Sequence, residues 1–196
     1  MQLTDYLKSE RKTYLIFDFD ETLFKLILPW DHCLDYIQEE LKKLDKNILR
    51  DFEEKRLNLS ETQNAYISKY GQRVKKLIYS NNTQFETKQL KGVLLNKELL
   101  EFILTNKEYK LFIWSSNTSV VINKILDQYK IFNKFQKIVT RLDVDLIKPE
   151  IEGFELINKP SISTNNYLFI GDSDSDEKAA KRLDMDFFFV DYFRNK

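Results

Sequence analysis

Residues 13–22, TYLIFDFDET, join an apolar run to two carboxylates, Asp18 and Asp20. A run of hydrophobic residues without apolar/polar alternation is typical of a strand buried on both faces. Such strands belong to parallel sheets, in which ligands collect beyond the carboxyl ends of the strands. Side chains two positions apart on a strand point to the same side, so Asp18 and Asp20 are predicted to face one site there.

The same dense pattern occurs five times along the chain. The predicted strands are Thr13–Phe19, Leu111–Trp114, Phe135–Thr140, Tyr167–Ile170 and Phe187–Val190. Helical patterns lie between most of them, such as Lys97–Thr105 and Val120–Tyr129. Alternating strands and helices predict the α/β class with right-handed crossovers. We therefore expect a Rossmann-like parallel five-stranded sheet flanked by helices.

One long interval, Pro29–Lys91, contains no strand-like run and is rich in helical periodicity. It predicts a small α-helical cap, residues 29–91, inserted after the first strand into an α/β core of residues 1–28 and 92–196. One cap helix carries an apolar stripe at spacings of three and four. Its members are Leu34, Ile37, Leu41 and Leu44. The segments Leu28–Asp31 and Asn81–Lys91 are predicted to be the hinges, the second because it is polar and has no apolar face.

The composition bounds the function. In 196 residues, 31 Lys and Arg balance 31 Asp and Glu, so no net field favours nucleic acid or an acidic membrane surface. The N-terminus lacks the apolar core of a signal peptide, and no stretch is long enough to cross a bilayer. We expect a cytoplasmic protein, with its oligomeric state open. The single cysteine, Cys33, excludes an internal disulfide and a thiolate metal cluster.

Two further segments carry groups suited to anions. Ser115, Ser116, Asn117 and Thr118 follow the second strand and precede a helix. Hydroxyls and free N–H groups there either hold phosphate oxygens or simply cap the helix. Arg141 and Lys148 follow the third strand, and each either meets an anion or lies on the surface.

The segment after the fourth strand, GDSDSDE at residues 171–177, holds four carboxylates in six residues and so predicts a cation site. Asp172, Asp174 and Asp176 have the one-three-five spacing of an EF-hand loop. However, the sixth position is Glu177 instead of glycine, and the twelfth is Leu183 instead of an acid. Mg²⁺ suits a site built from several loops better than Ca²⁺ does, because Mg²⁺ keeps waters and takes one or two carboxylates.

In this order, the four segments resemble the motifs of the haloacid dehalogenase superfamily, which are DxDx[TS], a Ser or Thr, a Lys, and GDxxxD. The matching residues are Asp18, Asp20, Thr22, Ser115, Lys148, Gly171, Asp172 and Asp176. The insertion between the first two motifs resembles the C1-type helical cap. The sequence departs from the family at Glu21, where Gly is common, and at Ile151, where many relatives have a second Pro.

The resemblance implies a role for each carboxylate of the site. Asp18 would be the nucleophile and a Mg²⁺ ligand. Asp20 would protonate the leaving oxygen and then accept a proton from water, while its backbone carbonyl binds the metal. Asp172 would complete the protein ligands of Mg²⁺. Asp176 would hold a metal-bound water or the Lys148 ammonium, and Thr22 would be a further supporting residue.

The resemblance also implies how the phosphoryl group would be held. Ser115 and the backbone amide of Ser116 would grip it, and Lys148 would neutralise charge in the transition state. Which cap residues face the substrate is open. The candidates are Arg50, Arg56, Arg73 and Lys76.

Together these features predict a Mg²⁺-dependent phosphatase of the phosphoglycolate phosphatase or β-phosphoglucomutase type. It would hydrolyse a small phosphorylated metabolite through an aspartyl-phosphate on Asp18. The presence of Asp20 favours phosphate chemistry, because dehalogenases of the superfamily lack a carboxylate there. Three alternatives stay open: a sugar-phosphate mutase, a receiver-type phosphoacceptor signalling module, and a non-catalytic binding protein.

Overall fold

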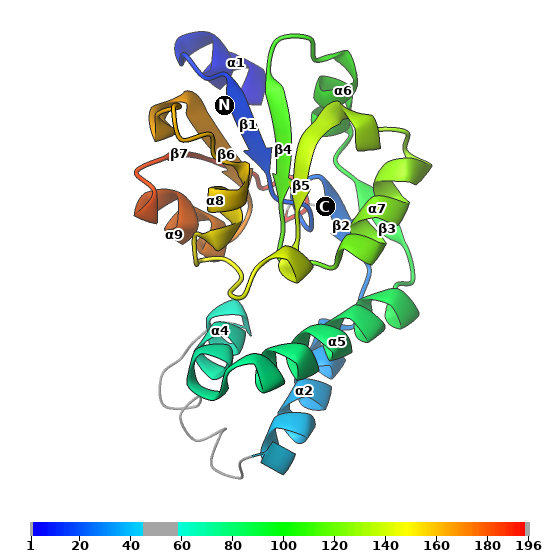
Figure 1. Cartoon of the computed structure of the whole chain (residues 1–196). Coiled ribbons are helices and arrows are strands. Elements are labelled where there is room, and N and C mark those ends of the chain that lie inside the picture. The colour runs from blue at the N-terminus through cyan, green and yellow to red at the C-terminus, as the bar shows by residue number, and fades with distance from the viewer. Residues whose placement is uncertain (1, 45–58, 195–196) are drawn as a thin grey trace.

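Five parallel strands form the central sheet, in the order β5-β4-β1-β6-β7 (Figure 1). The computed structural model describes residues 2–44 and 59–194. The strands are β1 (Tyr14–Phe17), β4 (Lys110–Trp114), β5 (Phe135–Val139), β6 (Tyr167–Gly171) and β7 (Asp186–Phe189). Each coincides within a few residues with a predicted strand, so the Rossmann-like α/β class is confirmed.

Helices cover both faces of this sheet, which is why its strands read as continuous apolar runs. Leu15 and Phe17 pack with the helices of one face, and Tyr14 and Ile16 with those of the other. The first face is covered by α1 (Leu3–Ser9), α6 (Lys97–Thr105) and α7 (Ser119–Gln128), and the second by α8 (Glu152–Ile157) and α9 (Asp174–Arg182). Burying a side chain of the size of Leu15 stabilises the fold by about 1.5–3 kcal/mol.

The strand order separates this fold from the receiver alternative. Numbered along the chain, the five parallel strands lie in the order 3-2-1-4-5. Receiver modules share the flavodoxin-like order 2-1-3-4-5. A signalling module of the receiver type is therefore excluded as an interpretation of this chain.

A second, two-stranded sheet connects the core to the insertion and was not predicted. In it, β2 (Phe24–Leu26) pairs antiparallel with β3 (Val93–Leu95). The two strands have three residues each, which is too short to give a periodicity signal. The ribbon brings the chain back to the core at Val93, which pairs with Leu26 and follows it by 67 residues in the chain.

Three helices of the insertion lie beyond the carboxyl ends of the sheet strands (Figure 1). We call these helices, α2 (Trp30–Leu44), α4 (Leu59–Tyr70) and α5 (Gln72–Gln89), the cap. In the predicted stripe of α2, Ile37 and Leu41 are buried. The division at residues 28 and 92 stays a prediction, and of the candidate substrate residues Arg50 and Arg56 lie outside the described residues.

The predicted hinge at Asn81–Lys91 is wrong for most of its length, because α5 continues to Gln89. One face of α5 is buried from end to end, with a residue every fourth position. The members of this stripe are Val74, Ile78, Asn82 and Glu86. The stripe is apolar in its first half and polar in its second, which is why the sequence showed no apolar face after residue 80.

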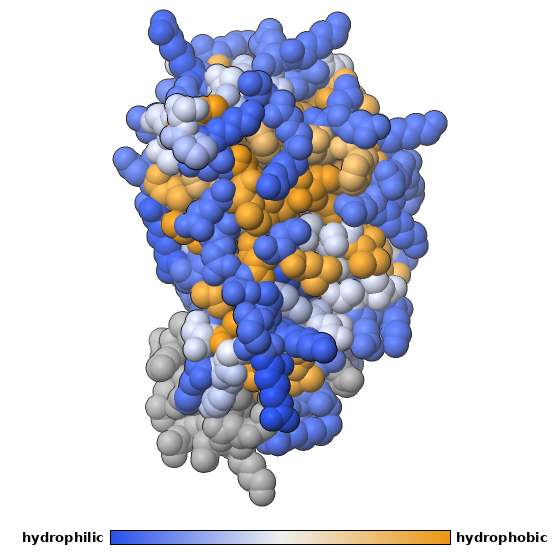
Figure 2. All heavy atoms as spheres, in the orientation of Figure 1, coloured by the Kyte–Doolittle hydropathy of each residue, from blue (hydrophilic) through white to orange (hydrophobic). Residues whose placement is uncertain are grey.

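Hydrophilic residues cover most of the surface seen in Figure 2, and an apolar area lies over the front of the sheet. The cover there includes α8, a helix of only six residues. Among the residues that the structure describes, no helix combines the length and apolar character needed to cross a membrane.

Candidate active site

A cavity of about 480 Å³ lies where the cap meets the carboxyl ends of the strands. Five of the predicted site residues line it. They are Asp18, Asp20, Ser116, Lys148 and Asp172. Thr22, Ser115 and Asp176 are buried behind this lining. The structure thus gathers all eight predicted residues, from four separate loops, at one end of the sheet.

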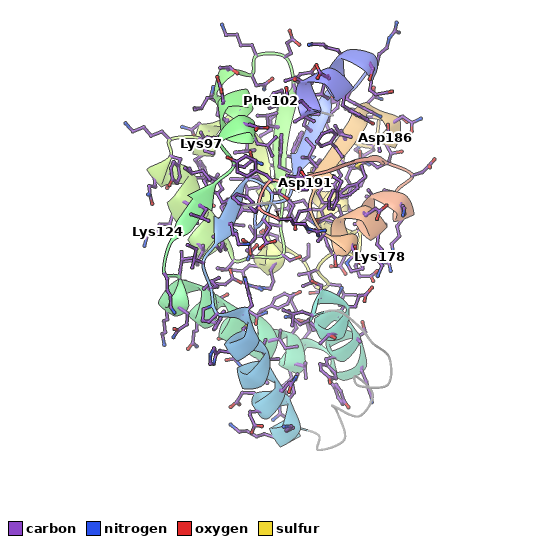
Figure 3. The ribbon with its side chains drawn as sticks, turned by 180° about the vertical axis from the view of Figure 1, so that it is seen from behind. Lys97, Phe102, Lys124, Lys178, Asp186 and Asp191 are labelled. Carbon is purple, nitrogen blue, oxygen red and sulfur yellow. The ribbon has the colours of Figure 1, made fainter. Side chains whose placement is uncertain are left out.

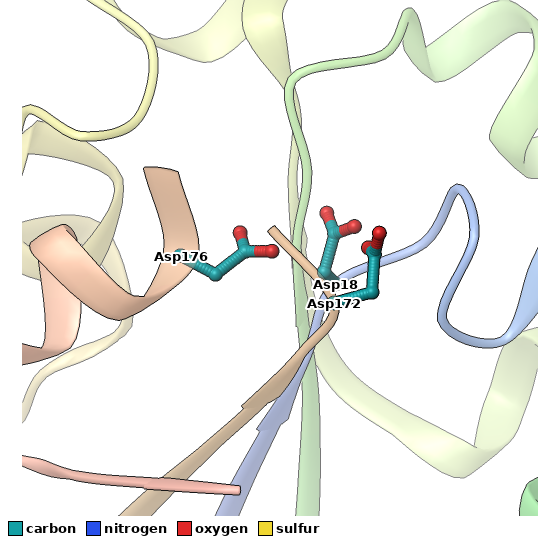
Figure 4. A group of neighbouring side chains, drawn as sticks. All are labelled: Asp18, Asp172 and Asp176. Carbon is teal, nitrogen blue, oxygen red and sulfur yellow. The ribbon is translucent and has the colours of Figure 1, made fainter. Parts of the chain in front are cut away.

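Lys148 joins two carboxylates at the centre of the site. Its Nζ lies 2.6 Å from Oδ1 of Asp18 and 2.5 Å from Oδ1 of Asp176. All three side chains are buried, with at most a tenth of each exposed. In Figure 4, Asp18 and Asp172 point the same way from adjacent strand ends, and Asp176 reaches toward them from α9. Lys148 is therefore placed inside the site and not on the surface.

The orientation of Asp176 follows from the start of α9. Asp176 and Ser173 form a capping box, in which Oδ2 of Asp176 accepts the Ser173 hydroxyl at 2.7 Å and its N–H at 3.1 Å. The side chain also lies against Gly171, where an added Cβ would come within 2.7 Å of Oδ2. The glycine of the GDxxxD motif is therefore required by close approach, and Asp176 is free to bind Lys148 only through Oδ1.

The acidic group fits a divalent cation. Ligand oxygens of Asp18, Asp172 and Asp176 all lie within 4.8 Å of one another. Three carboxylates against the one Lys148 ammonium leave an excess of two negative charges when all are ionised. Oxygen donors of this kind suit a hard cation such as Mg²⁺. Because both oxygens of Asp176 already accept hydrogen bonds, Asp18 and Asp172 are the better placed ligands.

The pKa values reflect this crowding. Burial raises the pKa of Asp18 well above its ordinary value, and the charges of Asp176 and Asp172 add to this while Lys148 opposes it. Burial, with the charge of Asp176, raises the pKa of Asp172 to about 6. Burial alone would lower the pKa of Lys148, but attraction to Asp176 and Asp18 outweighs it and leaves that pKa above its usual value. Lys148 is therefore a permanent cation of the site.

Asp20 is held by the loop that leads to the cap. Its Oδ1 accepts the N–H of Leu26 at 2.8 Å and that of Glu21 at 3.1 Å. Burial raises the pKa of Asp20 to about 8, although the hydrogen bond from Leu26 opposes the shift. Glu21 has a φ of +58°, in the left-handed region that glycine enters without strain. This conformation explains why glycine is common here in the superfamily.

The segment after β4 is partly closed by the cap. The Ser115 hydroxyl donates to Oδ1 of Asn117 at 3.0 Å, and the backbone N–H of Ser115 binds the carbonyl of Val139. Ser116 and Asn117 line the cavity. The N–H of Thr118, at the start of α7, donates to Oε2 of Glu86 at 2.9 Å. One donor of the predicted anion cradle is therefore occupied by a carboxylate of α5.

Arg141 is the second cation of the region. It is buried, lines the cavity, and forms an ion pair with the fully buried Glu86 of α5. Its Nε–H has no hydrogen-bond partner among the described residues. Arg141 therefore does bind an anionic group, but that group is the Glu86 carboxylate of the chain itself.

The cap side of the cavity was not predicted. Gln63 and Asn82 line it and are hydrogen-bonded to each other at 3.0 Å. The predicted candidates Arg73 and Lys76 are exposed and do not belong to this lining. The sequence did contain a signal for this part of the cap. Asn82 and Glu86 continue the four-residue spacing of Val74 and Ile78, which predicts that they lie on the same helix face.

Comparison with known proteins agrees with this geometry. The family model of the haloacid dehalogenase-like hydrolases matches residues 15–190. The chain belongs to this family. The predicted superfamily and the prediction of a hydrolase are therefore confirmed. A comparison with curated protein sequences finds no significant match.

Solved structures of this family share the fold at low sequence identity. A haloacid dehalogenase-like hydrolase from Bacteroides fragilis has a TM-score of 0.65 and 21% identity, over 91% of this chain and 87% of that one. The HAD-hydrolase YfnB from Bacillus subtilis, bound to magnesium, gives 0.57 and 21%, over 93% and 90%. A predicted phosphoglycolate phosphatase from Haemophilus somnus gives 0.56 and 20%, over 93% and 86%.

A second hollow, of about 590 Å³, lies between α1, α6 and β7. Phe102 and Asp191, labelled in Figure 3, are among its lining residues. None of the eight predicted site residues lines it. This hollow is larger than the cavity that holds the carboxylates.

Proposed function

We propose that this chain is a Mg²⁺-dependent phosphatase that acts on a small phosphorylated substrate through an aspartyl-phosphate on Asp18. The observation that carries the proposal is the buried Asp18 carboxylate, 2.6 Å from the Lys148 ammonium and grouped with Asp172. Membership of the hydrolase family supports it. So do the magnesium of the YfnB structure and the phosphoglycolate phosphatase among the similar structures.

We assign the metal to Asp18, Asp172 and the backbone carbonyl of Asp20. The two carboxylates supply the hard oxygen ligands that Mg²⁺ prefers, and they leave room for waters and a phosphate oxygen. When bound, Mg²⁺ would supply positive charge against the carboxylates and the phosphoryl oxygens. Thr22 supports the assignment, because its hydroxyl donates to Oδ1 of Asp172 at 3.2 Å and fixes that side chain.

In the first step a carboxylate oxygen of Asp18 attacks phosphorus, and the bond from phosphorus to the alcohol oxygen breaks. Lys148 stabilises negative charge on the transferring group, which Ser115 and the amide of Ser116 orient. Asp20 gives its proton to the departing oxygen. The products of this step are the free alcohol and an aspartyl-phosphate.

In the second step a water molecule attacks the same phosphorus atom, and the Asp18–phosphorus bond breaks. Asp20, now ionised, takes the proton of that water, so one group serves as acid and then as base. Inorganic phosphate leaves and the Asp18 carboxylate is restored. The hydrogen bonds from Leu26 and Glu21 to Asp20 support this role, since they hold the carboxyl group at the cavity wall.

The proposal is tested by hydrolysis of a generic aryl phosphate with and without Mg²⁺. We expect metal-dependent release of inorganic phosphate, and a loss of about a thousandfold or more in Asp18→Asn. The matched control is Asp174→Asn, the same change at an exposed carboxylate of the same cavity, which should keep activity within about twofold of the parent. Undiminished turnover by Asp18→Asn would overturn the assignment.

The same assay on a panel of phosphorylated metabolites identifies the substrate and tests the mutase alternative. A phosphatase releases inorganic phosphate in proportion to the substrate consumed. A sugar-phosphate mutase instead converts one sugar phosphate into its isomer and releases little phosphate. The second result would change the proposed activity while leaving the role of Asp18 intact.

A further inference from the structure

The segment that leads into Lys148 is held by the cap. Residues 145–147 precede Lys148 directly, and side chains from two cap helices bind to them. The Tyr79 hydroxyl of α5 donates to the carbonyl of Asp145 at 2.9 Å, and Lys75 of the same helix forms an ion pair with the Asp145 side chain. From α4, Asn64 binds Ile147.

The contact between Asn64 and Ile147 is two-sided. Nδ2 of Asn64 donates to the carbonyl of Ile147 at 2.6 Å, and Oδ1 of Asn64 accepts the N–H of Ile147 at 3.0 Å. Both residues are about 95% buried. A carboxamide is the side chain suited to this task, because it offers one donor and one acceptor side by side. Asn64 therefore binds both peptide groups that flank Ile147.

Residues of the core also bind the same segment. Oε2 of Glu152 accepts the N–H groups of Asp145 and Leu146, at 2.7 and 3.1 Å. The carbonyl of Ile147 also accepts the N–H of Glu150, at 3.1 Å. The N–H of Ile147, in contrast, is bound by Asn64. Loss of Asn64 would remove a cap contact that the core contacts do not replace at this N–H.

The position of Lys148 depends on these peptide groups. The carbonyl that Asn64 binds belongs to the peptide bond between Ile147 and Lys148, so its orientation sets the direction in which the Lys148 side chain leaves the backbone. The Lys148 ammonium must lie between Asp18 and Asp176, at 2.6 and 2.5 Å. Displacements of about 1 Å at a catalytic group cost about a hundredfold in rate.

We propose that Asn64 is a positioning residue, which couples the docking of cap helix α4 to the placement of the Lys148 ammonium beside Asp18. The inference rests on the proposed phosphatase activity. Asn64 does not belong to the cavity lining, so it acts through Lys148 and not through contact with the substrate. The cap then contributes to the chemical step as well as to substrate binding.

The test measures kcat and KM for an aryl phosphate at saturating Mg²⁺. Asn64→Leu removes both polar groups while keeping most of the side-chain volume, and Asn64→Ala removes them with the volume. We expect both variants to lose about tenfold or more in kcat, the size of effect seen when supporting residues of a site are removed, with KM changed less than about threefold. A kcat within twofold of the parent in the Asn64→Leu variant would overturn the proposal.

A matched control comes from the same helix. Glu61 of α4 forms an ion pair with Lys178 of α9 at 2.6 Å, which is also a contact between cap and core but has its core partner on α9 and not in residues 145–147. Glu61→Gln should keep kcat within about twofold of the parent. If it loses as much as Asn64→Leu, docking of the cap in general is responsible, and the specific role of Asn64 is refuted.

A double-mutant cycle with Lys148→Arg identifies the route of the effect. A larger guanidinium does not reproduce the ammonium position between Asp18 and Asp176, so alignment by Asn64 has less to act on. We expect Asn64→Leu to cost less than about threefold in this background. If the fold-losses in kcat of the two single variants multiply in the double variant, Asn64 acts independently of Lys148. Activity of the Asp18→Asn variant reports on the proposed function separately from these results.

Discussion

The two walls of the active-site cavity differ in charge. The wall formed by the α/β core carries Asp18, Asp172 and Lys148. The wall formed by the described cap residues carries no ionisable acid or base apart from a thiol. Its members are Trp30, Cys33, Leu59, Ser60, Gln63 and Asn82. Burial raises the pKa of the Cys33 thiol to about 11, so that group is neutral. In the proposed mechanism the charged groups therefore come from the core, whereas the cap contributes shape and neutral hydrogen bonds.

The Arg141–Glu86 ion pair marks the boundary between these walls. Glu86 comes from cap helix α5 and Arg141 from the turn after β5, and both are buried. Glu86 also accepts the N–H of Thr118. The charged groups at the boundary therefore neutralise each other and join cap to core.

Substitutions on the two walls should affect the kinetics differently. Lys148→Ala should lower kcat by about a hundred- to a thousandfold, because it removes a preorganised charge from the transition state. Gln63→Ala, on the cap wall, should change KM by less than about tenfold and leave kcat within about threefold. Steady-state kinetics with one aryl phosphate measures both. A loss of kcat in Gln63→Ala as large as that in Lys148→Ala would mean that the cap wall also takes part in chemistry.

The boundary pair gives the next effect, on stability. Arg141→Met should lower the free energy of unfolding by about 3–5 kcal/mol, because it leaves the Glu86 carboxylate buried without its cation. The double variant Arg141→Met/Glu86→Leu should recover a large part of that loss, since no uncompensated charge remains. Urea unfolding of the three proteins measures the differences. A loss below about 1 kcal/mol in Arg141→Met would mean that the pair is open to solvent, as in surface ion pairs.

The charge of the core wall should also make the stability of the metal-free protein depend on pH. The folded-state pKa values of Asp172 and Asp20 are raised to about 6 and about 8. A carboxyl with a raised folded pKa contributes stability that is present below its unfolded pKa and is lost as the pH rises through its folded pKa. In the presence of a metal chelator, the melting temperature should therefore decrease as the pH is raised from about 5 to about 9, apart from the contribution of other titrating groups.

Mg²⁺ and a substitution at Asp20 should each change this pH dependence. Excess Mg²⁺ should reduce the fall, because the cation binds the ionised carboxylates of the folded state. Asp20→Asn should remove mainly the part of this decrease in melting temperature that occurs near pH 8. A melting temperature that rises through this range in the chelator would contradict the description of the core wall as a site of uncompensated negative charge.

The core wall could be predicted from the sequence and the cap wall could not. The core strands are continuous apolar runs, and Asp18 and Asp172 follow such runs directly, where parallel strands place them at one edge. Lys148 lies nine residues after Val139, the last residue of β5, and was assigned to the site through the family resemblance. The order of these segments then resembled one superfamily. Their convergence needed no knowledge of side-chain contacts.

The prediction for the polar half of α5, a hinge at Asn81–Lys91, was wrong because burial was inferred from hydrophobicity. Asn82 and Glu86 are almost completely buried, yet each is satisfied by a distant partner, Gln63 for one and Arg141 for the other. A buried polar residue reads in a sequence like a solvent-exposed one, because its partners lie elsewhere in the chain. The same reason hid Asn64, whose partner is 83 residues away.

In the proposed mechanism Asp18 carries the phosphoryl group, and this intermediate can be trapped in Asp20→Asn. An aryl phosphate has a good leaving group, so Asp18 should react without a proton donor, while hydrolysis lacks its base and the intermediate accumulates. After acid quenching, we predict phosphate bound to the peptide that contains Asp18, released by hydroxylamine, and absent in Asp18→Asn. Phosphate on another residue, or turnover without any bound phosphate, would rule out Asp18 as the phosphoryl acceptor.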